Sequence, residues 1–249
     1  MTVDPDLQAA HAASFTHGAD EYAAVRPGYP GAAVDLLLPD GSQDVLDLAA
    51  GTGKLTASLV ARGARVVAVE PADGMRAQLT AALPDVEVHA GTAEAIPLPD
   101  ASVDVVTVAQ AWHWFDEPVA SAEVARVLRP GGLVGIVWND RDEDVPWVGA
   151  YGALLHDAAG PQLARGTHPE LGEAFTDVLR TDVRWDHVLT PDELVRLAGT
   201  RSYAIVLPPD ERAALLDRVR TLVTTHPDLA GLTAIRVPYV TRVYTARRR

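Results

Sequence analysis

The 249-residue sequence contains no cysteine and only one lysine, Lys54. The absence of cysteine excludes disulfide bonds, thiolate metal sites and thiol nucleophiles. No apolar run approaches the roughly 20 residues that a membrane-spanning helix needs, and the first residues lack the basic-then-apolar pattern of a secretory signal. We therefore expect a cytoplasmic protein that has no membrane partner.

Basic residues are also scarce, since 21 Lys and Arg face 34 Asp and Glu and the formal net charge is −13. Phosphate repulsion at this charge argues against a nucleic-acid partner. The histidines show no paired spacing on a helix face, so the sequence predicts no metal site. A Gly-x-Ser-x-Gly motif is missing as well, which removes the commonest hydrolase interpretation. We expect a monomer or a homodimer.

The composition that is present, 48% hydrophobic and 22% charged, is typical of a folded globular domain. Apolar, β-branched runs alternate with segments of helical length as far as residue 139. This alternation predicts an α/β fold with a doubly wound, mainly parallel sheet. The predicted strands are Val45–Leu48, Arg65–Glu70, Val86–Ala90, Val103–Ala109 and Leu133–Trp138, and the helices between them are Lys54–Arg62, Met75–Leu83 and Pro118–Leu128.

We expect one domain in three parts. Residues 1–40 form helices and a lid at the N-terminus, residues 41–140 form the sheet core, and residues 141–249 form a helical cap insertion after the fifth strand, followed by C-terminal strands. In this last part the pattern predicts strands over 184–189, 203–207 and 237–245 and a helix over 209–223.

The most informative segment is 45–56, where an apolar strand runs into a turn with two glycines, Gly51 and Gly53, and then into a helix. This order places a ligand at the carboxyl end of a strand, facing a helix N-terminus. A phosphate-binding P-loop would need glycine at Leu48 and Ser or Thr at Leu55, and a dinucleotide fingerprint would need glycine at Thr56. A turn without a ligand remains the simplest alternative.

Further segments follow at regular distances along the chain. Glu70 ends the second strand 19 residues after Gly51, where a carboxylate can accept hydrogen bonds from both ribose hydroxyls of a nucleoside. Met75 can pack against an adenine face or fill the core. The stretches 88–100, 109–116 and 127–132 then follow the third strand, follow the fourth strand and lead into the fifth.

Together these segments resemble class I S-adenosylmethionine (SAM) dependent methyltransferases with a Rossmann-like fold, over roughly residues 40–140. The stretches 26–30, 111–116 and 138–142 are similar to those of small-molecule enzymes, among them the quinone-biosynthesis C-methyltransferases and the trans-aconitate-type carboxyl methyltransferases. Thr92, which precedes Ala93, departs from the acidic residue usual in the family. The resemblance implies SAM as cofactor.

The resemblance also implies two sets of site residues. SAM would be held by Asp47, Ala49, Gly51, Gly53, Glu70, Pro71, Met75, Ala93, Glu94, Gln110, Tyr22 and Arg26. The acceptor pocket would be formed by Trp112, His113, Trp114, Tyr29, Asn139 and Arg141. His113 is the candidate catalytic base, or it only orients the loop or SAM. Tyr22 and Arg26 either close over the site or pin a helix, and the tryptophans either line the pocket or anchor the strand end.

The expected activity is methyl transfer from SAM to a small molecule. A carboxylate oxygen is the leading acceptor, since Arg26 and Arg141 suit an acid and a carboxylate needs no base at pH 7. Two alternatives remain. The fold also permits a SAM-binding protein with a non-methylating biosynthetic or scaffold role, and it also permits a methyltransferase that acts on a macromolecule.

Overall fold

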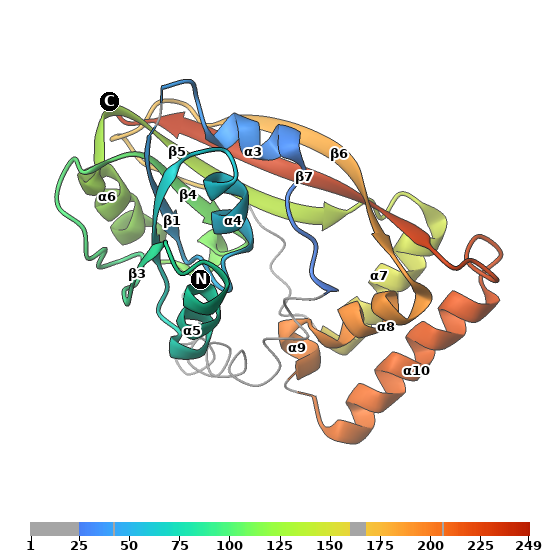
Figure 1. Cartoon of the computed structure of the whole chain (residues 1–249). Helices are drawn as coiled ribbons and strands as arrows, with labels where there is room; N and C mark the ends of the chain where they lie inside the picture. The colour runs from blue at the N-terminus through green and yellow to red at the C-terminus, as the bar shows by residue number, and fades with distance from the viewer. Residues whose placement is uncertain (1–24, 42, 160–167, 206) are drawn as a thin grey trace.

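The computed structural model describes residues 25–41, 43–159, 168–205 and 207–249 (Figure 1). Its centre is a seven-stranded sheet in the order β3-β2-β1-β4-β5-β7-β6. Strands β1 to β5 are parallel, whereas β7 runs antiparallel to both of its neighbours. The doubly wound, mainly parallel sheet is thus confirmed. The strands are β1 (Asp44–Leu48), β2 (Arg65–Val69), β3 (Glu87–His89), β4 (Val103–Ala109), β5 (Leu128–Arg141), β6 (Leu179–Leu189) and β7 (Ile235–Arg247).

Helices cover both faces of the parallel part of the sheet. Helices α3 (Gly31–Leu37) and α4 (Lys54–Val60) bury Leu37 and Leu59 against one face, in a cluster that includes Val45 of β1. Helix α6 (Glu117–Val127) packs on the opposite face, in a cluster that includes Leu46. Neighbouring strand residues therefore serve different helix layers, as expected for strands buried on both sides. Helix α5 (Asp73–Ala82) follows β2.

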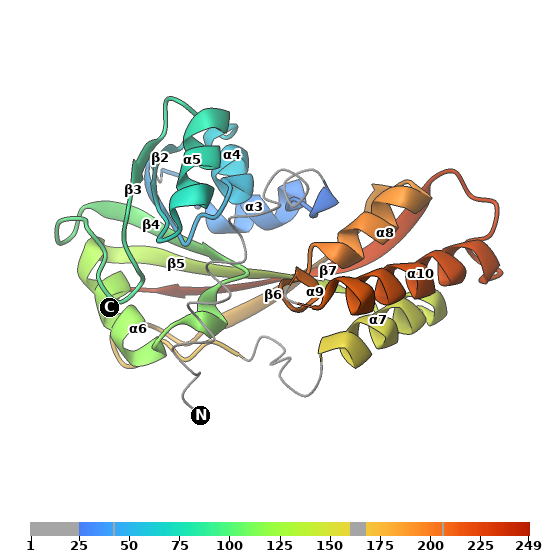
Figure 2. The ribbon, with the colours of Figure 1, turned by 90° about the horizontal axis from the view of Figure 1, so that it is seen from below.

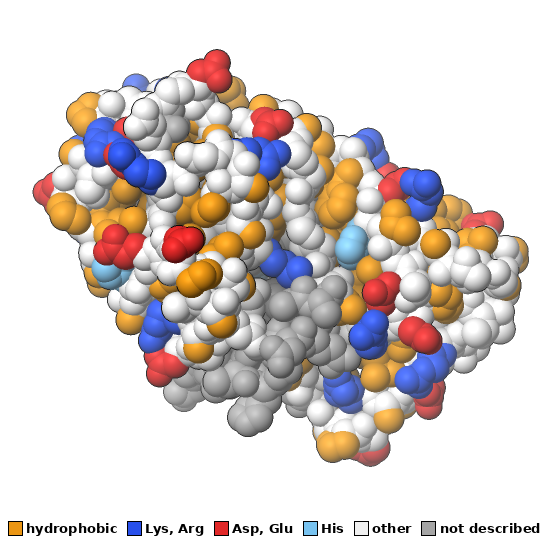
Figure 3. Space-filling model, viewed as in Figure 1, with side chains coloured by type: hydrophobic (Ala, Val, Ile, Leu, Met, Phe, Trp, Pro, Cys, Tyr) orange, Lys and Arg blue, Asp and Glu red, His pale blue; other side chains and the backbone are white. Residues whose placement is uncertain are grey.

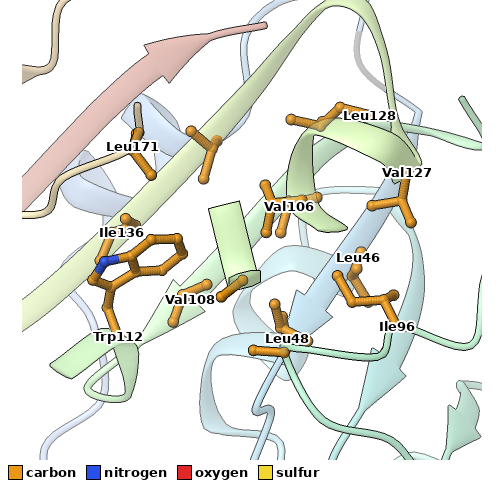
Figure 4. Packing of buried hydrophobic residues seen from close by; sticks show 14 of the residues in the cluster. Leu46, Leu48, Ile96, Val106, Val108, Trp112, Val127, Leu128, Ile136 and Leu171 are labelled. Atoms are coloured by element: carbon orange, nitrogen blue, oxygen red, sulfur yellow. The ribbon is translucent and has the colours of Figure 1, made fainter. Parts of the chain in front are cut away.

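The cluster beneath α6 contains the labelled residues of Figure 4, among them Leu48, Val108 and Ile136 from three adjacent strands. The α6 layer is fixed at its start by Asp116, whose carboxylate accepts a hydrogen bond from the Val119 backbone N–H. An N-cap of this kind satisfies one of the free N–H groups of the first turn. The well-packed layer holds the carboxyl ends of β1 and β4 in place.

A second hydrophobic cluster forms a cap beside the sheet core (Figure 2). Its helices are α7 (Pro146–Ala159), α8 (Pro191–Gly199), α9 (Ser202–Ile205) and α10 (Pro209–Thr225). They pack against the ends of β6 and β7, which extend from the core into the cap. Helix α7 follows β5, as the predicted insertion does. Helices α8 to α10 lie between β6 and β7, where the sequence placed a helix over 209–223 between two C-terminal strands.

Two predictions need correction. The fifth strand runs over 14 residues and exceeds the predicted Leu133–Trp138 at both ends. Pairing with β7 continues to Arg141 and extends it at the C-terminal end, and pairing of Leu128 with Val103 of β4 extends it at the N-terminal end. The strand predicted over 203–207 is wrong. Helix α9 covers Ser202–Ile205, and Ala204 is buried in the cap cluster. A short apolar run does not distinguish a strand from a buried helical turn.

The predicted N-terminal lid falls mostly on residues 1–24, which lie outside the described residues, and with them Tyr22. Within the described ranges, every helix is too short or too polar to cross a lipid bilayer.

Candidate functional site

The site lies where the strand order reverses. Strand β1 is followed along the chain by β2 on one side, while β4 pairs with its other side and leads to β5. In open α/β sheets, ligands bind outside the carboxyl ends of the strands at such a switch point. Ala49 and Gln110, which follow β1 and β4, both have left-handed backbones, with φ of 56° and 59°. Strained non-glycine residues cluster at functional sites.

The glycine turn connects β1 to α4. Gly51 and Gly53 have φ of 58° and 84°, conformations that favour glycine. A Cβ on Gly53 would lie 2.9 Å from Leu79 Cγ of α5, and one on Gly51 would lie 3.5 Å from Met75 Sδ. Helix α5 therefore packs against the turn, and its residue Met75, which is 7% exposed, lies next to Gly51.

Asp47 supports the turn from inside the protein. Its carboxylate is fully buried and accepts hydrogen bonds from Thr56 Oγ1 of α4 at 2.6 Å and Thr107 Oγ1 of β4 at 3.1 Å. Burial raises the pKa of Asp47 from 3.8 to about 6, and the two threonine hydroxyls oppose that rise. The sequence singled out Asp47 as a contact of the ligand. In the structure its partners are the elements on either side of the turn.

Glu70 stands at the end of β2 and is 6% exposed. One carboxylate oxygen accepts a hydrogen bond from the Gly51 N–H and the other from the Ala72 N–H, both at 2.9 Å. Burial raises the pKa of Glu70, and these two backbone donors oppose the effect. A carboxylate oxygen has two lone pairs, so each retains capacity for a further donor beside the glycine turn.

Three further residues that were predicted to hold SAM make contacts away from the glycine turn. The Pro71 carbonyl accepts a hydrogen bond from Arg76 Nη1 at 2.6 Å. Ala93 is 3% exposed and belongs to the core cluster beneath α6. Glu94 Oε1 accepts a hydrogen bond from the Asp116 N–H at 3.0 Å and so supports the start of α6.

The aromatic stretch after β4 forms a short 3₁₀ helix, η1 (Trp112–Trp114), whose three side chains differ in environment. Trp112 is 1% exposed and points into the core beside Ile136 and Val108 (Figure 4). Its assignment to the acceptor pocket is therefore corrected to an anchor of the strand end. Trp114 is half-buried, and its ring centroid lies 4.8 Å from that of His113.

His113 contacts Trp138, which the sequence had marked only as part of a similar stretch. Trp138 Nε1 donates to His113 Nδ1 at 3.3 Å. An indole N–H can only donate, so Nδ1 is the acceptor and the neutral ring carries its proton on Nε2. Burial lowers the pKa of His113 from 6.5 to about 4. The side chain is thus a neutral hydrogen-bond donor at pH 7, which favours the orienting role over the catalytic base.

Two predicted acceptor-pocket residues are engaged in structural contacts. Asn139 donates through Nδ2 to the Gly28 carbonyl at 2.8 Å and accepts at Oδ1 from Thr241 Oγ1 at 2.6 Å. Arg141 forms an ion pair with Glu143 at 3.1 Å and lies over the Tyr151 ring. Tyr29 is half-buried against the cluster of α3 and α4. Asn139 therefore ties the segment before α3 to β5, and Arg141 is already paired with a carboxylate.

Three cationic or protonatable side chains lie on the glycine-turn side of the cap. Arg26 donates to Thr200 at the end of α8, through Nε to Oγ1 at 3.1 Å and Nη2 to the carbonyl at 2.7 Å. His187 Nε2 lies 3.2 Å from the Val25 carbonyl. Burial lowers the pKa of Lys54, and the nearby charge of Arg26 lowers it further. Figure 3 shows Lys or Arg atoms in a hollow of this face, between the core and the cap.

Lys54 is the residue that sequence reasoning missed. It is half-buried at the first position of α4, and no carboxylate of the described residues pairs with it. The signal was its position directly after Gly53 as the chain's one lysine. The sequence drew attention instead to Arg26 and Arg141, which the structure engages with Thr200 and Glu143.

Comparisons with known proteins agree with this geometry. Residues 46–136 match a family model described as a methyltransferase domain. The chain is 51% identical over 228 residues to an uncharacterized methyltransferase of Mycobacterium tuberculosis, covering 92% of this chain and 93% of that protein. It is 32% identical over 172 residues to demethylmenaquinone methyltransferase of Beutenbergia cavernae, covering 68% and 70%. A solved structure from Anaeromyxobacter dehalogenans, described as a type II methyltransferase, has a TM-score of 0.63 at 27% identity and covers 91% and 98%.

Proposed function

Because this chain belongs to the methyltransferases of class I fold, we propose that it transfers a methyl group from SAM to a small-molecule acceptor. The observation that carries the choice of SAM is the buried carboxylate of Glu70 beside the glycine turn, at the point where the strand order reverses. A carboxylate there suits the ribose hydroxyls of a nucleoside, and the family to which the chain belongs favours SAM as that nucleoside.

The chemistry of the residues around the turn fits SAM. Glu70 retains lone pairs for the ribose hydroxyls, and the backbone of Ala49 to Gly51 offers carbonyls for an α-amino group. Gln110 lies across the switch point, directly after β4. Asp47 keeps the turn attached to α4 and β4 through its two threonine partners. These residues would hold the nucleoside and amino acid parts of the cofactor.

When bound, SAM supplies a methyl group on a positively charged sulfur. We propose a carboxylate as the acceptor. A carboxylate oxygen forms the bond to the methyl carbon while the carbon–sulfur bond breaks, and the electron pair stays on sulfur. The products are a methyl ester and neutral S-adenosylhomocysteine, and no proton is transferred. The low pKa of His113 is compatible with this reaction, which needs no base. The chain would contribute mainly orientation and exclusion of water.

Lys54 supports the carboxylate proposal better than Arg141 does. A half-buried ammonium that no carboxylate of the described residues neutralises is costly unless an anion joins it. Arg26 lies close enough to lower the pKa of Lys54, and Lys54 in turn contributes to a lowered pKa at His187, for which burial is the main cause. The fitting ligand group is a carboxylate, supplied either by the acceptor or by the amino acid part of SAM.

The first test is isothermal titration calorimetry with SAM and S-adenosylhomocysteine. We expect micromolar binding by the wild type, weakened at least about tenfold in Glu70→Ala, because two ribose hydrogen bonds to a charged group are lost. Glu211→Ala, an exposed glutamate on α10, is the matched control and should bind as the wild type does. Absence of binding to either nucleoside would overturn the proposal.

A second test separates the two sources of the carboxylate. Lys54→Met and the conservative Lys54→Arg are compared for S-adenosylhomocysteine affinity and for the KM of an acid acceptor found by screening for ester formation. A KM raised about tenfold or more in Lys54→Met, with unchanged nucleoside affinity and recovery in Lys54→Arg, supports the carboxylate acceptor. A change confined to nucleoside affinity would assign Lys54 to SAM and remove this support.

A further inference from the structure

The exposed edge of the sheet carries a feature that the proposed function does not use. Strand β6 has one neighbour, β7, and within the described residues no strand pairs with its other side. Half of its backbone N–H and C=O groups therefore point outward, as on any edge strand. At 11 residues it is long for an edge, and its first four residues are all exposed. Such an edge is a template for pairing with another strand.

The charged side chains on one face of β6 alternate in sign. Arg180, Asp182, Arg184 and Asp186 are spaced by two residues and therefore lie on the same face of the sheet. All four are exposed. Edges that only resist aggregation can do so with charges of one sign, which repel any copy of themselves. A strand whose charges alternate in sign behaves differently, because each charge can face an opposite charge on a second copy of the same strand.

We propose that β6 pairs antiparallel with β6 of a second copy of this chain, about a two-fold axis at Val183. In this register Asp182 stands opposite Arg184 of the partner subunit, and Arg180 stands opposite Asp186 of the partner subunit. The symmetry repeats both pairs, so four opposite-charge pairs cross the junction. An isologous contact of this kind, in which residue i meets j and j meets i, is the commonest form of homodimer.

The charge pattern also selects the register. Centring the two-fold axis at Asp182 would place Asp182 opposite itself and Arg180 opposite Arg184 of the partner subunit. Centring it at Arg184 would place Arg184 opposite itself and Asp182 opposite Asp186 of the partner subunit. Directly opposed like charges destabilise a strand pair. If the axis is at position 181, only Arg180 and Asp182 face each other across the junction. If it is at position 185, only Arg184 and Asp186 do. The register at Val183 is thus the one that satisfies all four charges.

An apolar contact favours the same register. Leu179 is 68% exposed, the highest value among the exposed large hydrophobic residues described. Pairing about Val183 sets Leu179 opposite His187 of the partner subunit, a half-buried ring that packs against Trp185 and Tyr239. Leu179 would then be covered by a ring surface of the other copy. Backbone hydrogen bonds and this contact would supply affinity, while the charges fix the register.

In the single chain the same charges are held by local pairs at the surface, of which Arg180–Asp182 is bidentate. Arg180 contacts Asp182 at 2.6 Å, Arg184 contacts Asp142, and Asp186 lies 3.6 Å from Arg236. The side chains of these pairs are largely exposed except at Asp142, and exposed ion pairs contribute about 0–1 kcal/mol each. Each can therefore be exchanged for a cross-strand partner at little cost.

The test is the oligomeric state of charge variants, measured by sedimentation velocity between 1 and 100 µM. We expect the wild type to form a dimer. Asp182→Arg should raise the dimer dissociation constant by at least about tenfold, since symmetry turns two attractive pairs into repulsive ones. Asp182→Arg combined with Arg184→Asp exchanges the charges within one chain and restores opposition across the junction, so this double variant should dimerise again.

Controls make either result decisive. Asp217→Arg breaks an exposed ion pair on α10 and should leave the dimer unchanged. Melting temperatures and S-adenosylhomocysteine binding verify that each variant is folded, and raising NaCl to 0.5 M should weaken the wild-type dimer. A wild type that is monomeric throughout the concentration range would overturn the proposal. So would a dimer that Asp182→Arg leaves intact or that the double variant fails to restore.

Discussion

Asp47 and His113 are titratable groups at the site, and burial stabilises the neutral form of both. Burial raises the pKa of the Asp47 carboxyl to about 6 and lowers that of the His113 ring to about 4. The direction differs because a carboxylic acid is neutral when protonated and an imidazole is neutral when deprotonated. The two groups therefore affect stability with opposite dependence on pH.

Asp47→Asn should show this dependence for the carboxylate. The raised pKa means that Asp47 contributes stability fully below pH 3.8 and loses it as the pH rises through 6. We expect the free energy of unfolding of Asp47→Asn, relative to wild type, to rise by about 2 kcal/mol between pH 4.5 and 7.5. Urea unfolding at several pH values measures it, with Asp217→Asn as the exposed control. A flat difference would contradict a buried Asp47.

His113→Gln tests whether the ring acts as a base. Glutamine can still accept the Trp138 indole N–H, and a pKa of about 4 leaves the wild-type ring neutral throughout pH 5.5–8. We expect the wild-type pH profile of kcat/KM to show no ionisation near 6.5, and His113→Gln to keep its shape with kcat reduced less than about tenfold. A loss of 10² or more, together with loss of a limb near pH 6–7, would indicate a general base.

The sequence predicted the surroundings of a residue when these depend on neighbouring strands, and it did not when they depend on a distant part of the chain. The sequence assigned Glu70 and Gly51 to one site, and the structure brings them into hydrogen-bond contact, because both follow neighbouring parallel strands whose carboxyl ends meet. The pairing of Arg141 with Glu143 was not predictable, because it depends on the course of the chain after β5. Trp112 and Trp114 are two positions apart, yet a single 3₁₀ turn sends one into the core.

At the scale of elements, the contact between α3 and β5 depends on the absence of a side chain. A Cβ on Gly135 would overlap Leu37 Cδ2, and Leu37 is fully buried. We expect Gly135→Ala to lower the free energy of unfolding by about 1–3 kcal/mol, as overpacking does. Thermal and urea unfolding measure the effect.

The double variant Gly135→Ala/Leu37→Ala distinguishes overpacking from a backbone effect. If the two side chains compete for one space, the combined loss should be smaller than the sum of the two single losses. Gly28→Ala is the control, since a Cβ there would meet no atom within 4 Å. Strict additivity would show that α3 shifts freely and that Gly135 does not set its distance from the sheet.

Predicted elements matched the structure where each helix or strand has its own sequence signal. Strands β1 to β4 fall close to their predicted ranges, because each is a β-branched run that ends at a turn signal. Strand β6 was predicted only over its last six residues. Of its first five residues, Leu179–Val183, four are exposed and two carry charges, so the apolar pattern of a buried strand is missing. Their strand conformation comes from pairing with β7, which follows some 60 residues later.

At the scale of the whole molecule, the cap has its own hydrophobic cluster, separate from the two that flank the sheet. Leu215 of α10 is fully buried in it. We expect Leu215→Ala to lower the free energy of unfolding by about 2–5 kcal/mol, while S-adenosylhomocysteine affinity stays within twofold. Leu232→Ala, at a leucine 46% exposed, is the control. A parallel loss of affinity would show that the cap cluster shapes the donor site.

The sequence predicted the core of the molecule better than the cap. The order of strands and helices to residue 139 follows the α/β alternation, and each crossover has a short, recognisable form. The cap helices pack mainly on one another and on strand ends far away in the chain. Helix α9 has four residues, and the cap position of β6 and β7 depends on that packing.

Strands β6 and β7 run from the core into the cap without a linker, and β5 pairs with β7 over most of its length. Strand β5 is about 45 Å long at the usual rise per residue, and its pairing with β7 runs unbroken from Leu133–Arg247 to Arg141–Tyr239. The cap is therefore attached to the core through a continuous set of paired strands, here called the beam. Any movement that opens the site must bend or twist that beam, so the resisting force grows with the displacement. We therefore expect the cap to move by elastic bending of these strands and to return to its starting position, and not to rotate freely about a hinge.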